Sequence, residues 1–351
     1  MRVLILGTGQ MGSGIARVVL TKPGLALVGA YGRRVGRAGM DMGQAIGLGR
    51  TLDMPISTDL ATLLDRCHPH VAIQATCSRL VDAVEEIRML LRHRVHVISI
   101  AEELAYPFRV SPPLAASLHD LARAYRVALV GTGINPGFVL DLLVIALSGV
   151  CADIQSITAR RVNDLSPYGP SVLTSQGVGL TPEQFHGGLQ DGTVVGHIGF
   201  PQSISMIADA LGWEIAEIAE TRAPLISHVR RETPFVTVAP GQVAGCLHTA
   251  TGFRRGQPVI TLVHPQQIHP HLEGVETGDA IEIIGTPSIR LAGSPEIPGG
   301  HATVALAVNM IPRVLRASPG LHTMADLPVP AAMLGDVRTL IHRGCQEDQH
   351  G

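Results

Sequence analysis

The chain of 351 residues has few aromatic side chains, 3% against 46% for all hydrophobic residues, so its core must be aliphatic. It also lacks an excess of one charge, because the formal net charge is −2 and no long run of like charges occurs. These absences argue against the basic footprint of a nucleic-acid-binding protein and against a polybasic membrane anchor. We therefore expect a globular protein of about two domains that binds neither nucleic acid nor membrane.

Paired cysteines and targeting segments are missing as well. The five cysteines are scattered without a C-x-x-C motif, as expected for reduced thiols. The most apolar stretch, residues 127–150, contains Asn135, Pro136 and Asp141 and is too interrupted to span a bilayer. No signal peptide fits, because a predicted strand begins at residue 2 and runs into glycines. These features predict a cytoplasmic protein.

A glycine-rich turn follows the first predicted strand, residues 2–6. It has the pattern G-x-G-x-x-G, formed by Gly7, Thr8, Gly9, Gln10, Met11 and Gly12. In a dinucleotide-binding turn Gly7 makes the bend, Gly9 lets the pyrophosphate approach, and Gly12 packs the following helix on the strand. The alternative is a glycine-rich turn without a ligand.

The second predicted strand, residues 25–31, does not end in the acidic residue that commonly binds the ribose 2′-hydroxyl of NAD. Gly32, Arg33 and Arg34 follow it instead. Two cations in place of an acid suit a 2′-phosphate, so the sequence favours NADP, with NAD possible. The alternative for the two arginines is a solvated loop.

The pattern of elements predicts two domains. Over residues 1–134 aliphatic strands alternate with helices, which indicates a doubly wound Rossmann domain of the α/β class. Beyond the first two strands, its elements are predicted at 71–75, 80–92, 95–101, 113–125 and 127–130. A late helix, residues 303–315 with Pro312 near its end, opens a segment, 303–351, that should pack back on this domain.

Residues 135–302 follow another pattern, in which glycine and proline separate longer strands. Strands are predicted at 154–163, 235–239, 259–263 and 280–284, and helices at 181–189 and 203–211. This arrangement indicates a second, α+β domain with an open mixed or antiparallel sheet.

Polar residues follow the strands of the first domain, at the edge where such sheets bind ligands. Thr76 and Cys77 come after one strand, and Glu102 and Glu103 after the next. In an extended segment neighbouring side chains point to opposite faces, so one of the two carboxylates should enter the site. If burial raised its pKa, that carboxylate could hold a substrate ammonium and take its proton. The alternative is an ordinary acidic helix N-terminus.

A second glycine-rich bend, residues 131–138 (GTGINPGF), joins the domains before a predicted helix at 138–147. Gly133, Asn135 and Pro136 could border nicotinamide and substrate, and the alternative is a plain hinge. In the second domain several polar residues could grip a substrate or serve structural hydrogen bonds. They are Asn163, Asp164, Tyr168, Gln176, His197 and the pair Arg160-Arg161.

Three histidines, His264, His269 and His271 (HPQQIHPH), invite a metal interpretation. Their spacing matches no compact zinc motif, and two prolines keep the segment extended. Hydride transfer to nicotinamide needs no metal, so no metal site is predicted. The sequence also shows no nucleophile elbow and no phosphate-binding P-loop.

Several segments taken together resemble one known family. They are 7–12, 100–107 (IAEELAYP), 131–138, 164–178, 195–200 (VGHIGF), 264–267 (HPQQ) and 309–330. Over about residues 1–335 the chain resembles the 2,4-diaminopentanoate dehydrogenase family, which is related to amine dehydrogenases and shares the dihydrodipicolinate reductase fold. The paired-histidine and lysine motif of the reductase itself is absent, which argues against dihydrodipicolinate reduction.

The resemblance implies NAD(P)-dependent oxidative deamination of 2,4-diaminopentanoate at C4, a step of ornithine degradation that is reversible as reductive amination. The products would be 2-amino-4-oxopentanoate and ammonia. Glu102, with Glu103 close behind, would be the amine-binding acid/base, and Asn135 would line the nicotinamide side. The open sheet of the second domain would build a homodimer or a higher homo-oligomer.

This substrate carries two ammonium groups and a carboxylate, which one glutamate cannot balance. We therefore expect Asn163 or Asp164 near the second amine, and an arginine or His197 near the carboxylate. Many relatives carry an acid after the second strand, so the cofactor preference is taken from Arg33 and Arg34 here.

Two other functions remain open at this point. One is a broader amine dehydrogenase or imine reductase acting on simple ketones and amines. The other is a nucleotide-sensing regulator without catalysis, against which the glutamate pair argues, since a sensor needs no proton acceptor.

Overall fold

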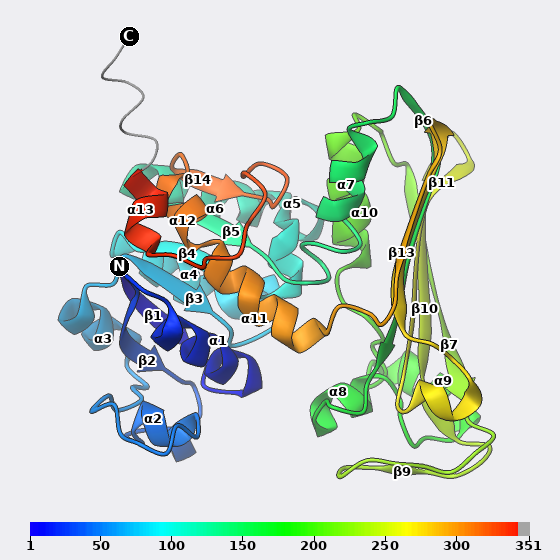
Figure 1. Cartoon of the computed structure of the whole chain (residues 1–351), viewed down its shortest axis with the longest axis horizontal. Helices are drawn as coiled ribbons and strands as arrows, with labels where there is room; N and C mark the ends of the chain where they lie inside the picture. The colour runs from blue at the N-terminus through cyan, green and yellow to red at the C-terminus, as the bar shows by residue number, and fades with distance from the viewer. Residues whose placement is uncertain (343–351) are drawn as a thin grey trace. The chain divides into compact units, whose positions relative to one another are not determined.

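The structure is a computed structural model and describes residues 1–342. The chain divides into two compact units, which we call unit 1 (residues 1–138 and the chain from 299 onward) and unit 2 (residues 139–298) (Figure 1). The sequence pattern alone places these two boundaries at 134 and 302. Among the described residues, no helix is both long and apolar enough to cross a membrane.

Unit 1 is built on a parallel sheet of six strands in the order β14–β5–β4–β3–β1–β2. The strands are β1 (Arg2–Leu6), β2 (Ala26–Tyr31), β3 (Val71–Gln74), β4 (His96–Ser99), β5 (Ala128–Gly131) and β14 (Gly320–His322). Their side chains are aliphatic and mostly buried, as a sheet covered on both faces requires. The predicted doubly wound Rossmann fold is confirmed.

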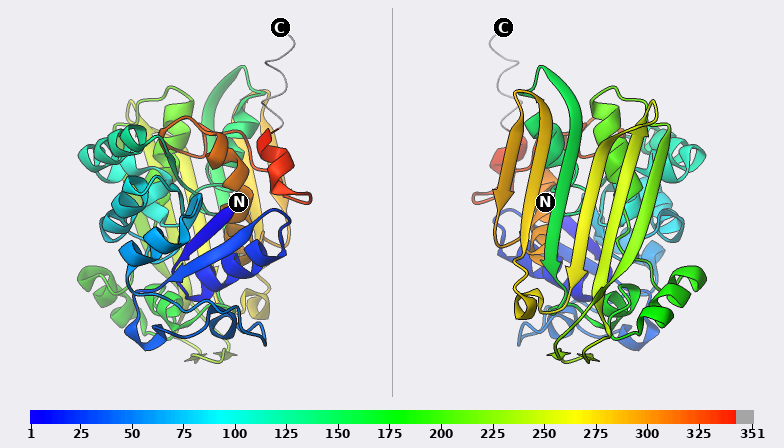
Figure 2. Two further views of the ribbon diagram at one scale, coloured as in Figure 1. Left: turned by 90° about the vertical axis from the view of Figure 1, so that its left-hand side faces the viewer. Right: turned by 90° about the vertical axis from the view of Figure 1, so that its right-hand side faces the viewer.

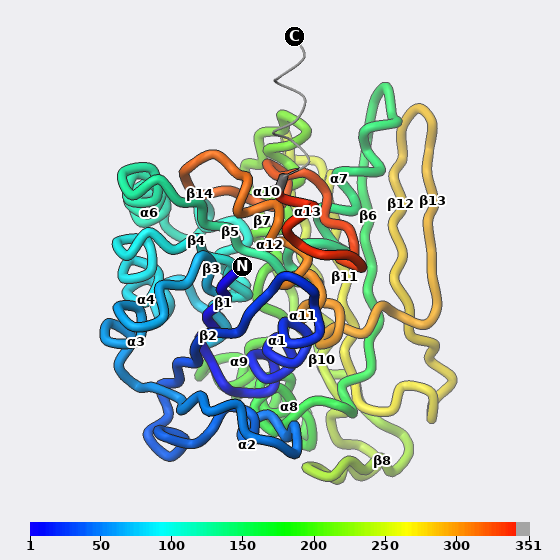
Figure 3. The backbone as a smooth tube through the Cα atoms, turned by 60° about the vertical axis from the view of Figure 1, so that its left-hand side comes forward, coloured from blue at the N-terminus to red at the C-terminus, as the bar shows by residue number. Residues whose placement is uncertain are grey.

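Helices cover both faces of this sheet, with α4 and α6 on one side and α1 and α11 on the other (Figure 3). The helices are α1 (Gln10–Thr21), η1 (Val35–Arg37), α2 (Met42–Ala45), α3 (Leu60–Cys67), α4 (Leu80–Arg92), η2 (Glu102–Ala105), α5 (Pro107–Val110), α6 (Pro112–Tyr125), α11 (Gly299–Asn309), α12 (Ile311–Arg316) and α13 (Val337–His342). A Cβ on Gly14 of α1 would lie 2.8 Å from Val304 of α11, so these two helices pack closely.

The single helix predicted at 303–315 is wrong. The chain forms two helices, α11 and α12, and Pro312 lies in the first turn of α12. Proline is tolerated there because the first-turn amides have no partner within the helix.

Unit 2 is built on a mixed sheet of six strands in the order β13–β12–β6–β11–β10–β7. Only the β6–β11 pair is parallel within this sheet. The strands are β6 (Asp153–Asp164), β7 (Glu217–Ile226), β10 (Val243–Arg254), β11 (Gln257–Gln267), β12 (Gly278–Thr286) and β13 (Ile289–Gly293), and a separate small ribbon joins β8 (Arg231–Glu232) to β9 (Thr237–Val238). The predicted α+β class is confirmed, but the strand expected at 235–239 is only the short β9.

The helices of unit 2 are α7 (Leu142–Ser148), α8 (Pro170–Ser175), α9 (Pro182–Asp191), α10 (Phe200–Ala210) and η3 (Pro270–Glu273). Helix α7 begins later than the predicted residue 138 because Asp141 caps it, accepting the Leu142 N–H over 2.6 Å. In the right-hand view of Figure 2, the strands of the unit 2 sheet face the viewer, and no helix lies in front of them.

Candidate active site

The glycine turn lies where β1 ends and α1 begins. Gly7 has φ +101°, and a Cβ there would lie 2.3 Å from the Ala75 carbonyl oxygen, while a Cβ on Gly12 would lie 1.8 Å from that of Gly7. The packing of unit 1 therefore requires both glycines. Gly9 differs, because its φ of −76° suits any residue and a Cβ there would have no neighbour within 4 Å. The space beside Gly9 is left for a ligand that approaches the backbone.

The first turn of α1 suits an anion at that place. Gly9 is its N-cap and has no side chain to satisfy the free amides of Gln10, Met11 and Gly12, and the first turn contains no acid. Free amides and the helix dipole together favour a phosphate group. The turn thus fits the pyrophosphate of a dinucleotide.

Arg33 is held by the buried carboxylate of Glu86 on α4. Its Nε lies 2.7 Å from Glu86 Oε1, and Thr76 donates its hydroxyl to Glu86 Oε2 over 2.6 Å. Cys77 Sγ lies 3.8 Å from the guanidinium. The bond to Glu86 raises the pKa of Arg33 and already balances its charge. Arg33 is therefore less available to a phosphate than the sequence suggested.

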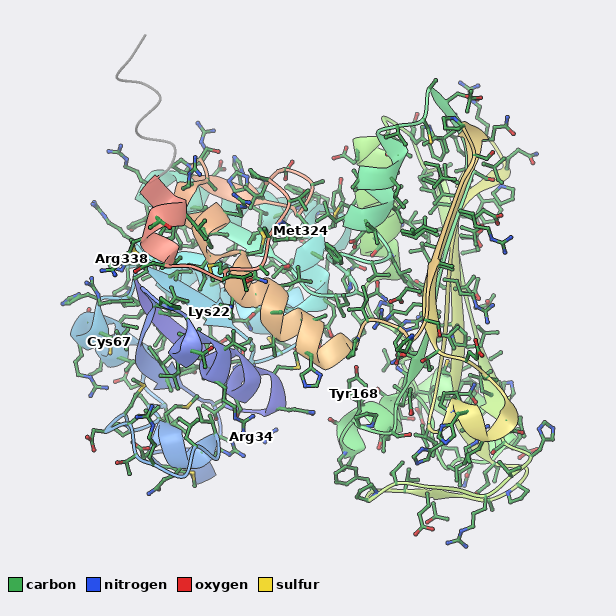
Figure 4. The ribbon with its side chains drawn as sticks, in the orientation of Figure 1. Lys22, Arg34, Cys67, Tyr168, Met324 and Arg338 are labelled. Atoms are coloured by element: carbon green, nitrogen blue, oxygen red, sulfur yellow. The ribbon has the colours of Figure 1, made fainter. Side chains whose placement is uncertain are left out.

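Arg34 and Arg37 differ from Arg33. The Arg34 side chain is exposed, and no ion pair involving it is found within residues 1–342 (Figure 4). Arg37, which sequence reasoning did not single out, donates to the Thr8 carbonyl in the glycine turn. Gly32 brings this segment close, since a Cβ there would lie 3.2 Å from Thr8 Oγ1. Within the same residues, two cations with no carboxylate partner thus lie beyond β2.

The two adjacent glutamates have different roles in unit 1. They lie in η2, so the extended geometry expected for them is wrong. Glu103 accepts the N–H of Leu80 over 2.7 Å and satisfies a free amide at the start of α4. Burial raises the pKa of Glu102, although a hydrogen bond with Ser78 opposes this. Of the two carboxylates, Glu102 therefore has the raised pKa, and Glu103 has the contact that supports the start of α4.

Asn135 is a second unusual group, on the bend after β5. Neither its amide oxygen nor its amide nitrogen has a hydrogen-bond partner among the described residues, although the side chain is buried, and the hydroxyl of Thr132 is also unpaired. Each such buried group costs about 1–3 kcal/mol, so native structures seldom leave one without a ligand or water. A Cβ on Gly133 would lie 2.9 Å from the Pro136 carbonyl oxygen, which shows how tightly the bend closes.

The end of β5 also lies against η2. A Cβ on Gly131 would be 2.1 Å from the Leu104 carbonyl oxygen, so the segment that carries Glu102 packs on the strand that leads to Asn135. The strands β4 and β5 pair in register, Ser99 with Gly131. Glu102 and Asn135, both predicted as site residues, therefore follow neighbouring strands at the carboxyl edge of the sheet.

Unit 2 has its own cluster of unpaired polar atoms. The rings of His197 and His264 are 5.0 Å apart, and within the described chain His197 Nε2, His264 Nδ1 and Gln202 Oε1 are buried without a hydrogen-bond partner. His264 bonds through Nε2 to Asn163 Oδ1 over 3.0 Å. Burial lowers the pKa of His197 to about 3 and that of His264 well below its usual range, so both rings are neutral near pH 7.

The other charged candidates of unit 2 are engaged in the fold. Asp164 Oδ1 accepts the N–H and hydroxyl of Ser166 and the N–H of His269. Arg161 is buried and forms an ion pair with Asp279 over 2.6 Å. These contacts tie Arg161 and one oxygen of Asp164 into the fold, while Asn163 positions the ring of His264.

Tyr168, Gln176 and Arg160 show no comparable unpaired group in the part of the chain that the structure describes. Tyr168 packs against the apolar cluster around Leu173, and Gln176 donates to the Gly196 carbonyl over 2.8 Å. Arg160 is exposed on β6.

A family model described as the 2,4-diaminopentanoate dehydrogenase C-terminal domain matches residues 138–343, and one described as the dihydrodipicolinate reductase N-terminus matches residues 1–100. The chain is 44% identical over 342 residues to 2,4-diaminopentanoate dehydrogenase of Acetoanaerobium sticklandii, and the matched region covers 97% of each chain. This chain belongs to the 2,4-diaminopentanoate dehydrogenase family.

Two relatives named as amine dehydrogenases are also similar to this family member. The solved structure from Mycobacterium smegmatis superposes with a TM-score of 0.83 at 28% identity, covering 93% of this chain and 96% of that one. The protein of Streptomyces virginiae is 26% identical over 355 residues, covering 94% and 97%. The predicted resemblance is confirmed, and the chain is a dehydrogenase with a Rossmann-like nucleotide-binding domain.

Sequence reasoning missed several residues of this dehydrogenase. Arg37 ends an arginine-rich stretch and could have been included with Arg33 and Arg34. Glu86 and Gln202 gave no signal, because each is one polar residue on a helix whose partners are distant in sequence. His264 was considered only as a metal ligand, whereas the structure pairs it with Asn163.

Proposed function

We propose that the chain oxidises 2,4-diaminopentanoate at C4, releasing 2-amino-4-oxopentanoate and ammonia, and catalyses the reverse reductive amination. The observation that carries this proposal is a pair of unusual groups after two neighbouring strands. Glu102, with a raised pKa, follows β4, and Asn135, with an unpaired buried amide, follows β5. The name of the relative with 44% identity supports the choice of substrate.

A nicotinamide dinucleotide held by the glycine turn, Gly7 to Gly12, would supply the hydride acceptor for C4. Glu102 takes a proton from the C4 ammonium, because only the neutral amine can donate electrons to C4 as the hydride leaves. Because the pKa of Glu102 is raised, it lies closer to the pKa of the substrate amine. The proton transfer is therefore easier than for an ordinary glutamate. The resulting iminium carbon then adds water and releases ammonia. Asn135 orients the reacting groups through its free amide.

Unit 2, considered by itself, carries neutral polar groups that suit an ammonium and a carboxylate. Because Asn163 Oδ1 accepts the Nε2–H of His264, the ring presents Nδ1 as an acceptor for an ammonium N–H. His197 supplies a second unpaired ring nitrogen, which as a neutral donor can bind the carboxylate. Tyr168 and Asp164 then shape the surrounding loop.

NADP is the cofactor we propose to be preferred. Arg34 and Arg37 bind its 2′-phosphate, since neither faces a carboxylate within residues 1–342, while Arg33 stays with Glu86. NAD can still bind through the glycine turn. Initial rates with each cofactor measure the preference.

The open face of the unit 2 sheet supports a homodimer or a higher homo-oligomer. In register, Thr249 of β10 lies beside Thr221 of β7 and Val263 of β11, so small and β-branched side chains form the centre of this face. Small side chains at the centre of this face, with Arg160 of β6 beside Val263, suit pairing with a second copy. Light scattering of the purified protein tests this proposal.

A cytoplasmic location also remains a proposal. It is supported by the cysteines, because the four within residues 1–342 are free thiols. Cys345 lies outside the described residues.

A second candidate is a broader amine dehydrogenase, which the TM-score of 0.83 to the Mycobacterium smegmatis protein favours. A substrate panel with reduced-nicotinamide absorbance separates the two. We expect turnover of 2,4-diaminopentanoate to exceed that of simple amines by about 100-fold, the effect of a paired polar end. Comparable rates on simple amines would instead support the broader activity.

A further inference from the structure

Three ligand-type side chains of unit 2 come together where β6 and β11 end. These strands pair in parallel, Gln267 beside Asp164, so the segments that follow them start as neighbours. One ligand atom each from Asp164, His269 and His271 lies within 4.8 Å of the other two. The spacing of the histidines alone predicted no metal, because the third member precedes His269 by 105 residues.

His269 already has the second contact that is common in metal-binding histidines. Its Nε2 lies 2.7 Å from the Glu232 carbonyl oxygen, which can only accept. The proton of the neutral ring is therefore on Nε2, and Nδ1 keeps a lone pair. A backbone carbonyl on the far nitrogen is the usual way to fix the tautomer and orientation of a metal ligand.

Asp164 is likewise oriented through one oxygen. The two bonds from Ser166 and the bond from the His269 N–H all reach Oδ1. Within the described part of the chain no hydrogen bond to Oδ2 is found, so this oxygen keeps its lone pairs for another partner. The same bonds hold Asp164 and His269 next to each other whether or not a cation binds.

His271 completes the group from the exposed side. It lies in η3 and is exposed, so its ring can rotate and solvent can reach the site. Ligand atoms around a tetrahedral zinc ion are about 3.3 Å apart, given Zn–N bonds of about 2.0 Å. The ligand atoms here lie within 4.8 Å of one another, so a rotation of the His271 ring can bring its nitrogen to the shorter spacing that zinc requires.

We propose that Asp164, His269 and His271 bind one divalent transition-metal ion, with Zn²⁺ as the best match and water as the fourth ligand. Two imidazole nitrogens and one carboxylate oxygen are a donor set that suits Zn²⁺ and Co²⁺ better than Mg²⁺ or Ca²⁺. The ion would tie the segment after β6 to the segment after β11. This role is structural and does not depend on the proposed reaction.

The test uses full-length protein without a histidine tag, freed of metal by chelation. Titration with Co²⁺, followed by its visible absorption, should show one tight site per chain, and Zn²⁺ should displace the colour. His271→Ala should weaken binding by about 100-fold or more, since even outer-shell changes cost 10–100-fold. Because His271 is exposed, this substitution should not disturb folding.

His228→Ala is the matched control. His228 is an exposed histidine of unit 2 that bonds Glu273 and lies outside the proposed ligand set. It should leave the Co²⁺ site intact, and Zn²⁺ should raise the melting temperature of wild type and of this variant but not of His271→Ala. Equal Co²⁺ binding by His271→Ala and wild type, or equal loss in both variants, would overturn the proposal.

Discussion

Burial acts in opposite directions on the pKa values of the two units' candidate groups. In unit 1 it raises the pKa of Glu102, and in unit 2 it lowers the pKa of His197 to about 3 and that of His264 well below its usual range. In each case the uncharged form is favoured. The consequence differs, because a carboxylate moves toward neutral pH while a histidine moves away from it. Unit 1 is thus suited to proton transfer, and unit 2 to recognition by neutral groups.

The largest effect should come from removing the proton acceptor of unit 1. Glu102→Gln keeps the shape of the side chain but cannot take a proton, so kcat should fall about 10²–10⁴-fold, the usual contribution of a general base. NADP binding, measured by fluorescence, should be unchanged. If this variant keeps near-normal turnover, unit 1 does not have the role assigned to it.

A smaller effect should follow from disrupting the cluster of His197, His264 and Asn163 in unit 2. His264→Gln loses the ring acceptor beside Asn163, and KM for 2,4-diaminopentanoate should rise about 10–100-fold, the cost of an unpaired polar group. Rates with a simple amine that lacks the amino-acid end serve as the control and should change little. An equal loss with both substrates would mean that the cluster only supports the fold.

The arginines should sharpen the comparison within unit 1. Arg34→Ala should raise KM for NADP about 10-fold, since a hydrogen bond to a charged group contributes about 1.5–3 kcal/mol, and should spare NAD. Arg33→Ala is the contrasting variant, because it leaves Glu86 without its partner and should affect both cofactors. If Arg34→Ala weakens NADP and NAD alike, Arg34 does not recognise the 2′-phosphate.

The smallest effect is expected for the neighbouring glutamate. Glu103→Gln weakens one bond at the start of α4 and should lower the free energy of unfolding by about 1 kcal/mol, as loss of a helix cap does. Turnover should stay within a few-fold of wild type, an order-of-magnitude expectation from the same principle. Denaturant unfolding and initial rates on one preparation check both statements. A severe loss of turnover would show that the roles of the pair are exchanged.

Much of unit 1 could be predicted because its signals are local. Parallel strands place their carboxyl ends at one edge, so a glycine turn and a glutamate pair after two strands could be assigned to one region. The sequence could not separate Glu102 from Glu103, since the choice depends on the Leu80 amide more than 20 positions away. The expected orientation also failed, because a 3₁₀ turn replaced the extended segment.

Unit 2 was harder to predict, because its signals depend on register. Strands β7 and β10 were missed: they carry threonine, alanine and polar residues in place of an aliphatic run. The partner of His264 is Asn163, 101 residues earlier, and only the parallel β6–β11 pairing brings them together. Local pattern therefore identified the residue types of this unit but not their partners.

The pH dependence of kcat/KM tests the assignment of Glu102 most directly. A base must be deprotonated to act, so kcat/KM should fall as pH decreases through a pKa above the usual glutamate value of about 4.3. Because burial lowers the pKa of His197 to about 3, that ring does not produce this limb. The account predicts the limb in wild type and in Glu103→Gln and its loss in Glu102→Gln. A limb that persists in Glu102→Gln, or that disappears in Glu103→Gln, would contradict it.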